Sequence, residues 1–291
     1  MTRTPVYILF GTGGLLGNAF LGKMSESIDP HRIFTFDHKQ ADITDPNQIS
    51  PLLEYIRPTV VINCAAVNDE DICEDAKTGA FNVNSRGPQY LAEACKKYTA
   101  KFVNFSSCTV FDGSRNTPYN ERHTTKPINV HGQSKVSGEQ AIRDVSEDHL
   151  IIRPGWVFHC NYQNCVTNWV SQGERGEEIA VLDDTIGSPT YAPDLVDATL
   201  NLIRVNATGT FHFSNSDAAS RQTLAEATLD LAKIRSRVVA VKPETQTYWK
   251  APTPKYSVLS TKKYSQATQM EVRTWLDALK HCLFSMNRYK P

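Results

Sequence analysis

The sequence predicts an α/β protein with a doubly wound parallel sheet and a smaller, interleaved α/β lobe. Three observations lead to this fold class. β-prone runs alternate with helix-compatible segments through the first half of the chain, the first run (residues 6–10) breaks directly into a glycine-rich turn, and the next run (residues 32–36) ends in Asp37. Alternation of this kind implies parallel strands joined by right-handed crossovers. Ligands of such sheets bind beyond the carboxyl ends of the strands.

The glycine turn is the first indication of a ligand site. Gly11, Gly14 and Gly17 recur every third residue directly after the first strand. A turn that opens a helix offers unpaired backbone N–H groups to a pyrophosphate, and a Cβ there would hold the phosphate away. The spacing is GxxGxxG rather than GxGxxG, so an ordinary strand–helix turn is the alternative interpretation. The strand that ends in Asp37, about 20 residues after the last glycine, favours dinucleotide binding because an acid there can bind a ribose hydroxyl.

The remaining elements follow from local signals. Asp45 and Pro46 predict the start of a helix that reaches residue 56. Further strands are expected at residues 60–66, 101–107, 150–158 and 209–214, and further helices at residues 78–98, from 129, and at 194–205, 220–233 and 271–284. The last two helices are amphipathic. Their side chains expected to face inward are Leu224, Leu229, Trp275, Leu276, Leu279 and Leu283.

These elements predict two interleaved lobes. Residues 1–158 are expected to form the dinucleotide-binding domain, to which residues 188–215 return. Residues 159–187 and 216–291 are expected to form the substrate-binding lobe. A polar segment, 163–184, and a proline-rich segment, 243–254, are expected to lie over the cofactor and the substrate.

Composition excludes several classes of protein. Lys plus Arg and Asp plus Glu balance at 31 each, so no net charge points to nucleic acid or to a membrane surface. No apolar run approaches the roughly 20 residues that a membrane helix needs. The chain passes directly into its first strand, and its 7 cysteines are scattered. We therefore expect no signal peptide, no metal site, a cytoplasmic location, and a homodimer as a candidate assembly.

Together the motifs resemble a known family. In chain order they are the glycine turn, Asp42-Ile-Thr, Asn63-Cys-Ala-Ala66, Val83-Asn84, Ser106-Ser-Cys-Thr-Val-Phe-Asp-Gly113, Pro118-Tyr-Asn-Glu121, Pro127-Ile-Asn-Val-His-Gly-Gln-Ser-Lys135, Arg153-Pro-Gly-Trp156 and Gly187-Ser-Pro-Thr190. This series resembles the extended short-chain dehydrogenases/reductases, with their Rossmann-like fold, and within them the dTDP-4-dehydrorhamnose reductase family. The resemblance covers nearly the whole chain. It implies NADP or NAD as cofactor and a nucleotide-linked sugar as substrate.

The resemblance also implies roles for residues. The catalytic Ser/Thr-Tyr-Lys set of the family falls on Ser107, His131 and Lys135. Cys108, Thr109, Trp156 and Arg221 fall on substrate-binding positions. The cofactor-binding positions are Gly11, Gly14, Leu15, Leu16, Gly17, Asp37, Asp42, Ile43, Cys64, Ala65, Ala66, Asn84, Ser106, Lys135 and Pro154.

The chain departs from the family on its substrate side. His131 stands where the family has its catalytic tyrosine, Cys108 and Thr109 replace an Asp-Tyr pair, and Arg221 aligns with a tryptophan. An imidazole can act as a general acid, and the alternative is a polar helix residue left after catalysis was lost. Cys108 is either a second acid/base or an inert buried thiol. Arg221 either holds a charged substrate group or is exposed to solvent.

We therefore expect an NAD(P)-dependent oxidoreductase that acts on a nucleotide-activated deoxysugar, most concretely at a 4-keto group. One alternative is a non-catalytic dinucleotide-binding subunit that resembles the β regulatory subunit of methionine adenosyltransferase. A nucleotide-sugar epimerase or dehydratase, which borrows the cofactor transiently, is the other. The choice between NAD and NADP stays open, because His38 and Lys39 beside Asp37 can meet a 2′-phosphate.

Overall fold

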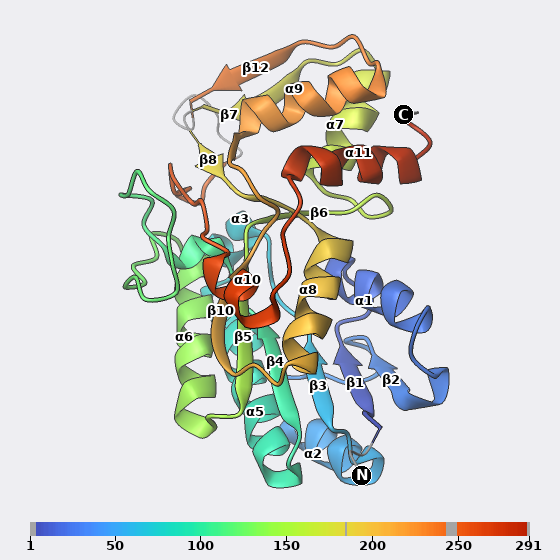
Figure 1. Cartoon of the computed structure of the whole chain (residues 1–291). Coiled ribbons are helices and arrows are strands. Elements are labelled where there is room, and N and C mark those ends of the chain that lie inside the picture. The colour runs from blue at the N-terminus through green and yellow to red at the C-terminus, as the bar shows by residue number, and fades with distance from the viewer. Residues whose placement is uncertain (1–3, 184, 243–248, 290–291) are drawn as a thin grey trace.

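A six-stranded parallel sheet forms the centre of the protein (Figure 1). The computed structural model describes residues 4–183, 185–242 and 249–289. The strand order is β10-β5-β4-β3-β1-β2, with each neighbouring pair parallel. The strands are β1 (Tyr7–Phe10), β2 (Ile33–Phe36), β3 (Val60–Asn63), β4 (Lys101–Phe105), β5 (His149–Pro154) and β10 (Gly209–Phe213). The order reverses at β1, which opens a crevice at the carboxyl ends of β1 and β3. The predicted fold class is confirmed.

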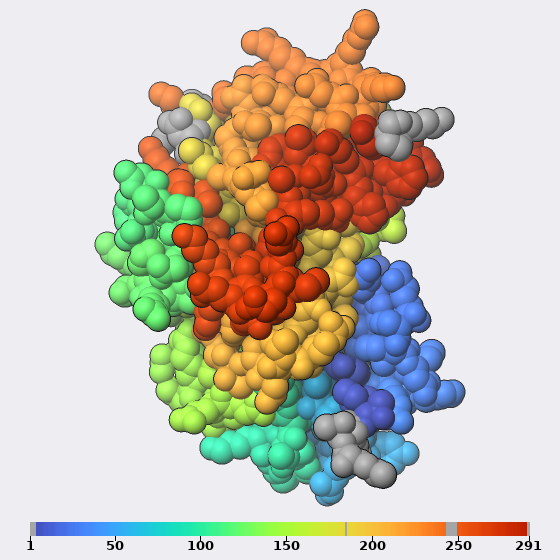
Figure 2. Space-filling view, in the orientation of Figure 1, coloured from blue at the N-terminus to red at the C-terminus, as the bar shows by residue number. Residues whose placement is uncertain are grey.

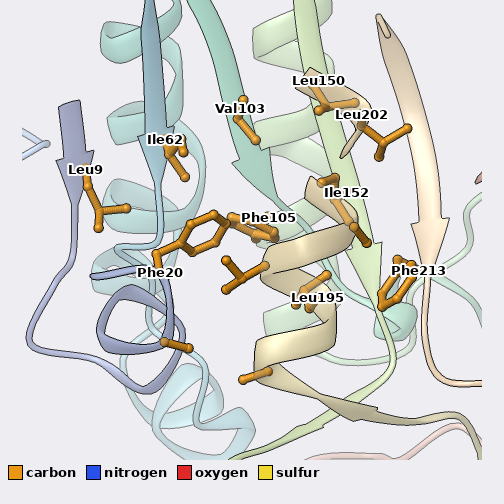
Figure 3. Close-up of a cluster of buried hydrophobic side chains, with 14 of the residues drawn as sticks. Leu9, Phe20, Ile62, Val103, Phe105, Leu150, Ile152, Leu195, Leu202 and Phe213 are labelled. Carbon is orange, nitrogen blue, oxygen red and sulfur yellow. The ribbon is translucent and has the colours of Figure 1, made fainter. Parts of the chain in front are cut away.

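Helices cover both faces of the sheet because successive strand residues point to opposite sides. Leu9, Ile62 and Val103 pack on one face with α1 (Leu15–Ser25) and α8 (Ala192–Arg204), as Figure 3 shows. Ile8, Val61 and Phe102 pack on the other face. That second face is covered by α2 (Pro46–Ile56), α5 (Gly87–Tyr98) and α6 (Val130–Val145). A sheet buried on both faces explains why the strands are continuously apolar rather than alternating.

The helix expected at residues 78–98 is interrupted. α4 (Lys77–Phe81) passes into a π-helical turn, η2 (Asn82–Arg86), and then into α5. A short helix, α3 (Glu70–Asp75), precedes this run. π-turns inside helices are rare and concentrate at functional sites. Here the turn places the buried side chain of Asn84 against the loop that leaves β3.

The strand expected at residues 150–158 is wrong in its second half. The chain leaves the large sheet after Pro154, and β6 (Trp156–Phe158) pairs in parallel with β9 (Pro189–Tyr191) in a separate two-stranded sheet. The break falls at Gly155, where a Cβ would stand 2.0 Å from the carbonyl oxygen of Ser188. This close backbone approach redirects the chain toward the small lobe and carries Trp156 with it.

The small lobe lies above the sheet in Figure 1 and has its own core. It contains α7 (Cys165–Glu174), α9 (Arg221–Ala232), α11 (Trp275–Ser285), the parallel pair β7 (Ile179–Leu182) and β12 (Val238–Val241), and the antiparallel pair β8 (Ile186–Gly187) and β11 (Ala219–Ser220). Leu224, Leu229, Trp275, Leu279 and Leu283 are buried as expected. Leu276 is 37% exposed, so its predicted inward position is wrong. It lies one residue away from the i, i+4, i+8 stripe formed by Trp275, Leu279 and Leu283.

One late helix lies against the large lobe. α10 (Lys262–Thr268) packs on α8 and β10, and Figure 2 shows these orange-red atoms lying against the gold atoms of α8. The predicted lobe boundaries stay a prediction. α10 lies within residues 216–291, which are predicted to belong to the substrate-binding lobe, but it contacts the dinucleotide-binding side. Residues 243–248 of the expected covering segment lie outside the described residues. Two single 3-10 turns, η1 (Pro30–Arg32) and η3 (Cys108–Val110), complete the description.

Candidate functional site

The glycine turn is shaped by backbone contacts. Gly11 has φ +81°, and a Cβ on it would stand 2.4 Å from the backbone nitrogen of Ala65. A Cβ on Gly17 would stand 2.1 Å from the carbonyl oxygen of Gly11. Any side chain at Gly11 or Gly17 would overlap with these backbone atoms. With glycine at both positions, α1 packs directly against the ends of β1 and β3. Gly13 and Gly14 have room for a Cβ, with nearest atoms at 3.9 and 3.5 Å.

The N-terminus of α1 is available to an anion. Gly14 is its N-cap, no side chain caps it, and its first turn holds no acidic residue. Uncapped N–H groups together with the positive end of the helix dipole fit a pyrophosphate. Leu15 and Leu16 follow at the start of the helix and pack against the sheet core. The residues present therefore fit a dinucleotide at this edge of the sheet.

Asp37 lies beside the glycine turn. A Cβ on Gly13 would be 3.9 Å from the Cβ of Asp37. Oδ1 of Asp37 accepts hydrogen bonds from the backbone nitrogens of Lys39 (2.9 Å) and Gln40 (3.0 Å), which fixes the carboxylate at the end of β2. His38 and Lys39 are exposed next to it. The structure thus brings together an acid suited to a ribose with a lysine and an imidazole suited to a phosphate.

Other predicted cofactor-binding residues have local partners. The Asp42 carboxylate accepts from the backbone nitrogen and the hydroxyl of Thr44, both at 2.8 Å, while Ile43 is a core residue. Asn84 accepts from the Val67 nitrogen and donates to the Val67 oxygen, both at 2.9 Å, and it also donates to Ser134. These side chains hold the loops at the sheet edge in place. Cys64, Ala65 and Ala66 follow β3, Ser106 follows β4 and Pro154 ends β5, all on the same edge.

Three side chains of the predicted site form one hydrogen-bond chain. Ser107 is the N-cap of η3, and its Oγ accepts from the backbone nitrogen of Thr109 at 3.2 Å. The Thr109 hydroxyl donates to the same Oγ at 2.9 Å, and Thr109 Oγ1 lies 3.0 Å from Nδ1 of His131. Because the Thr109 hydrogen is used toward Ser107, its oxygen accepts from Nδ1–H. The direction of these bonds leaves the Ser107 hydrogen free and places the ring proton of His131 on Nδ1.

Burial governs the ionisation of the two helix residues of this site. His131 and Lys135 are i and i+4 on α6, 4% and 5% exposed. Burial, and then the charge of Lys135, lower the pKa of His131 to about 3, so the ring is neutral at neutral pH. Burial lowers the pKa of Lys135 to about 8, while the Cys73 and Cys64 thiols oppose this shift. Nζ of Lys135 donates to the carbonyl oxygen of Phe105 at 3.1 Å, which holds the ammonium against the end of β4.

Nε2 of His131 has no hydrogen-bond partner among the described residues and less than 1 Å² of accessible surface. An unsatisfied ring nitrogen in the interior costs free energy. This nitrogen belongs to a predicted catalytic residue, so its missing hydrogen bond is explained by function rather than by stability.

The predicted substrate-binding residues meet on the small-lobe side. Cys108 is buried, and burial raises the pKa of its thiol to about 11, which favours an inert thiol. The Arg221 guanidinium lies over the Trp156 ring at 3.8 Å from its centroid. Arg221 is only partly exposed and therefore does not fit the solvent-exposed alternative.

The acidic segment that follows β3 was not predicted to take part in the site. Glu70 is partly buried, and burial raises the pKa of its carboxyl to about 7, an effect that the charge of Arg221 opposes. Oδ1 of Asp71 accepts from the backbone nitrogens of Lys250 and Ala251. Asn129 Nδ2 donates to both Glu70 and the carbonyl oxygen of Pro252. The sequence signal that could have identified this segment is the dense run of acidic residues at 69–75. Such a run beside the predicted ligand-binding edge of the sheet needs hydrogen-bond or ion-pair partners.

Two negative findings apply to the described parts of the chain. They contain no group of three or more His, Cys, Asp or Glu side chains placed to hold a metal ion. They also contain no helix whose length and apolar character would let it cross a bilayer.

Comparison with known proteins identifies the family. A family model described as the RmlD substrate binding domain matches residues 6–288. A dTDP-4-dehydrorhamnose reductase of Mycolicibacterium smegmatis is 32% identical over 94% of this chain and 83% of that protein. A dTDP-4-keto-6-deoxy-D-glucose reductase of Streptomyces niveus is 30% identical over 95% of this chain and 96% of that protein.

Solved structures agree. The Bacillus anthracis dTDP-4-dehydrorhamnose reductase in complex with NADP superposes with TM-score 0.91 at 31% identity, over 97% of this chain and 100% of that chain. A UDP-glucose 4-epimerase of Thermotoga maritima shares the fold at 17% identity and TM-score 0.84. The predicted family is therefore confirmed: the chain belongs to the RmlD substrate binding domain family, together with the dTDP-4-dehydrorhamnose reductases.

Proposed function

We propose that this protein is an NAD(P)-dependent reductase that acts on the 4-keto group of a nucleotide-activated deoxysugar. One observation carries the proposal: Ser107 and Lys135 lie at the carboxyl edge of the sheet, on the same edge as the uncapped N-terminus of α1. A carbonyl reductase needs this juxtaposition because hydride donor and oxyanion stabiliser must act on one carbon–oxygen bond. The relatives named as reductases of dTDP-linked keto sugars, one of them with NADP, support the same reaction class.

Each residue then has a task that its geometry permits. Backbone N–H groups of the glycine turn bind the pyrophosphate of the cofactor, and Asp37 binds a ribose hydroxyl. The bound, reduced nicotinamide supplies the hydride. The free Ser107 hydrogen donates to the carbonyl oxygen and stabilises the negative charge that develops there. Lys135 holds a positive charge beside this site while it is protonated.

His131 is the proposed source of the proton that completes the alcohol. In the tautomer inferred from the Thr109–Ser107 hydrogen bond, Nδ1–H points to Thr109, and the ring reaches Ser107 through this hydroxyl. Proton release along this path has to be balanced by proton uptake at Nε2, because imidazolate is far too basic to form. The path therefore delivers the Nδ1 proton through Thr109 and Ser107 to the substrate oxygen, and it balances only when a proton donor from solvent or from the bound ligand reaches Nε2.

The burial of Nε2 favours a second candidate function. This atom has less than 1 Å² of accessible surface, so no solvent reaches it in the described structure. If ligand binding opens no route for solvent to Nε2, His131 cannot be reprotonated and the catalytic cycle cannot be completed. The protein would then be a non-catalytic dinucleotide-binding subunit, as expected for a family member that lost its phenol.

Turnover decides between these candidates. The purified protein is mixed with NADPH or NADH and a panel of dTDP-, UDP- and GDP-linked 4-keto-6-deoxysugars, and the loss of reduced-cofactor absorbance is followed. Stoichiometric cofactor oxidation with formation of a 4-hydroxy sugar supports the reductase. Sugar conversion without net cofactor oxidation identifies an epimerase or dehydratase. Tight cofactor binding with no conversion of any sugar, and a stable heteromeric partner, support the regulatory subunit.

The assembly and the location complete the proposal. A homodimer and a cytoplasmic location, both expected from the sequence, fit a biosynthetic enzyme with a small-molecule substrate. Sedimentation equilibrium of the purified protein tests the first, and fractionation of the source cells tests the second. A monomer at all concentrations contradicts the dimer.

A further inference from the structure

One side of α6 carries an ionisable side chain at every fourth residue. His131, Lys135, Glu139 and Arg143 follow one another at i, i+4, i+8 and i+12. Residues four apart lie one above the other on a helix, with about 5–6 Å between their Cβ atoms. The first three are buried, and the side chain of Arg143 is 35% exposed. This stripe therefore runs from the candidate site, at the start of α6, toward the surface near the end of the helix.

Glu139 is the acid of this stripe, and its side chain is fully buried. Oε1 accepts from Nε of Arg153 at 2.7 Å, and Oε2 accepts from Nη2 of the same guanidinium at 2.6 Å, so the ion pair is bidentate. Oε2 also pairs with Arg143. Arg153 is a buried residue of β5, which lies beside α6 in Figure 1. These contacts from a helix and from the sheet hold the carboxylate in one position.

The Glu139 carboxyl is ionised at neutral pH. Burial by itself would raise the pKa of this carboxyl. The hydrogen bonds and the charge of Arg153, followed by the charge of Arg143, hold the pKa below its ordinary value instead. A fixed negative charge therefore lies one helical turn beyond Lys135, in the interior of the protein.

The other titratable groups that face Lys135 are uncharged at neutral pH. Burial raises the pKa of the Cys73 thiol, on α3, to about 11, and it also raises the pKa of the Cys64 thiol, which follows β3. His131, one turn before Lys135, is neutral because its pKa is about 3. Neutral thiols and a neutral imidazole do little to stabilise an ammonium whose pKa burial has already lowered to about 8.

The acids of α3, which also packs on α6, are engaged elsewhere. These acids are Glu70, Asp71, Glu74 and Asp75. Their carboxylates accept hydrogen bonds from residues 129, 130, 250 and 251. Among the described residues, Glu139 is the ionised carboxylate whose charge opposes the loss of the proton from Lys135.

We propose that Glu139 is a positioning residue for the reduction: it is the buried counter-charge that keeps Lys135 an ammonium, and Arg153 fixes it in this position. The inference rests on the proposed function for the task of Lys135, which is to hold a positive charge beside the carbonyl oxygen. Desolvation favours the neutral amine, and an opposite charge one turn away favours the ammonium. Glu139 acts through Lys135, since its own oxygens are occupied by the two guanidinium groups.

The test follows Lys135 directly, by NMR titration of the full-length protein with isotope-labelled lysine side chains, in which Lys135→Arg assigns the resonance. Glu139→Gln removes the charge and keeps the size of the side chain. It should lower the pKa of Lys135 from about 8 to about 7, the effect of a partly screened unit charge at this distance. Glu139→Asp keeps the charge and should leave this pKa nearly unchanged.

The matched control is Asp144→Asn, which converts a carboxylate to an amide on the same helix. Asp144 is exposed and accepts from the Gln140 side chain at 2.7 Å. This variant should not change the titration of Lys135, because solvent screens an exposed charge.

A second variant guards against unfolding. Glu139→Gln leaves the buried Arg153 without its partner, and an unpaired buried charge is strongly destabilising. The double variant Glu139→Gln, Arg153→Met removes both charges and keeps an apolar chain in the space of the guanidinium. Arg153 is not among the groups whose charge acts on Lys135, so the double variant should show the same lowered pKa of Lys135 as Glu139→Gln.

Two results would overturn the inference. If Lys135 titrates alike in wild type and in the double variant, Glu139 only anchors α6 to β5. If Glu139→Asp lowers the pKa of Lys135 as much as Glu139→Gln does, a displacement of the helix and not the lost charge is the cause.

These results are separable from those of the proposed function, because the titration needs no turnover. A lowered pKa of Lys135 in Glu139→Gln, without reduction of any keto sugar, keeps the counter-charge and rejects the reductase. Sugar reduction with an unchanged titration of Lys135 does the reverse. Where both hold, the alkaline limb of the pH–kcat profile of Glu139→Gln moves to lower pH by the same amount, whereas a purely structural role would lower kcat without moving this limb.

Discussion

The two sides of the candidate site are built in different ways. On the cofactor side, backbone meets backbone: a Cβ on Gly11 or Gly17 would stand within 2.4 Å of a main-chain atom. On the substrate side, side chains meet side chains, as in the stack of Arg221 on Trp156 and the chain from His131 through Thr109 to Ser107. A close backbone contact leaves no alternative residue, whereas a side-chain contact can be exchanged for another. A substitution is therefore tolerated more readily on the substrate side than in the glycine turn.

The largest effect is expected when a negative charge is introduced into the glycine turn. Gly14 has room for a Cβ, so Gly14→Asp keeps the fold but places a carboxylate against the pyrophosphate. Like-charge contact costs several kcal/mol, and measurable NADPH and NADH affinity should be lost. Gly14→Ala is the matched control and should bind both cofactors nearly as wild type. Titration calorimetry measures this, and cofactor binding by Gly14→Asp at wild-type affinity would falsify the role of the turn.

The second effect tests whether the side-chain half is catalytic. If His131 supplies the proton, His131→Ala slows reduction by ~10²–10⁴ and leaves cofactor affinity unchanged. His131→Tyr should retain or raise the rate, because Ser107 and Lys135 stand where a phenol needs them. Single-turnover rates with a saturating keto sugar give the comparison. Full activity of His131→Ala removes histidine from the mechanism.

The third effect concerns the residue expected to contact the substrate oxygen. Ser107→Ala should lower kcat about 100-fold, the lower range for one lost oxyanion donor, with little change in cofactor affinity. Ser107→Thr keeps the hydroxyl and should restore most of the rate. Steady-state kinetics separate kcat from KM. Were Ser107→Ala as fast as Ser107→Thr, the hydroxyl chain would have no catalytic part.

A smaller effect is expected from pH. The pKa of Lys135 lies at about 8 rather than 10.5, so its ammonium is lost as pH rises through about 8, and the rate should fall about tenfold per unit above it. His131, with a pKa of about 3, is neutral throughout this range and should give no inflection near neutrality. Lys135→Arg should remove the alkaline limb of the pH–kcat profile. A rate that falls between pH ~5 and ~8 would instead indicate an essential imidazolium.

The smallest effect is expected at Lys39, at the exposed end of the cofactor side, and tests its contact with a 2′-phosphate. Lys39 beside Asp37 is exposed, and an exposed ion pair contributes at most about 1 kcal/mol. Lys39→Ala should weaken NADPH binding by up to about fivefold and leave NADH binding unchanged. Lys23→Ala, on the far end of α1, is the matched control. Equal losses for both cofactors would show that Lys39 does not meet a 2′-phosphate.

Local patterns determined most of the fold and the cofactor half of the site. Apolar runs that end in glycine or in small residues predict buried parallel strands, and the sheet follows. The i, i+4 pair His131 and Lys135 and the glycine spacing of the turn depend on neighbours in sequence, which are already close in the unfolded chain. The closeness of Asp37 and of Ala65 to that turn follows from the pairing of β1 with β2 and β3.

Tertiary structure decided the rest. The break at Gly155 is set by the Ser188 backbone, and the Arg221–Trp156 stack joins residues 65 positions apart (221 − 156). Leu276 lies outside the buried side of α11 because the small-lobe core contacts only one side of that helix. The direction of the hydroxyls between Ser107 and His131 depends on two elements meeting, η3 and α6. Sequence spacing carries no information on such contacts, because the free energy that selects them comes from burial and pairing between segments that only the folded chain brings together.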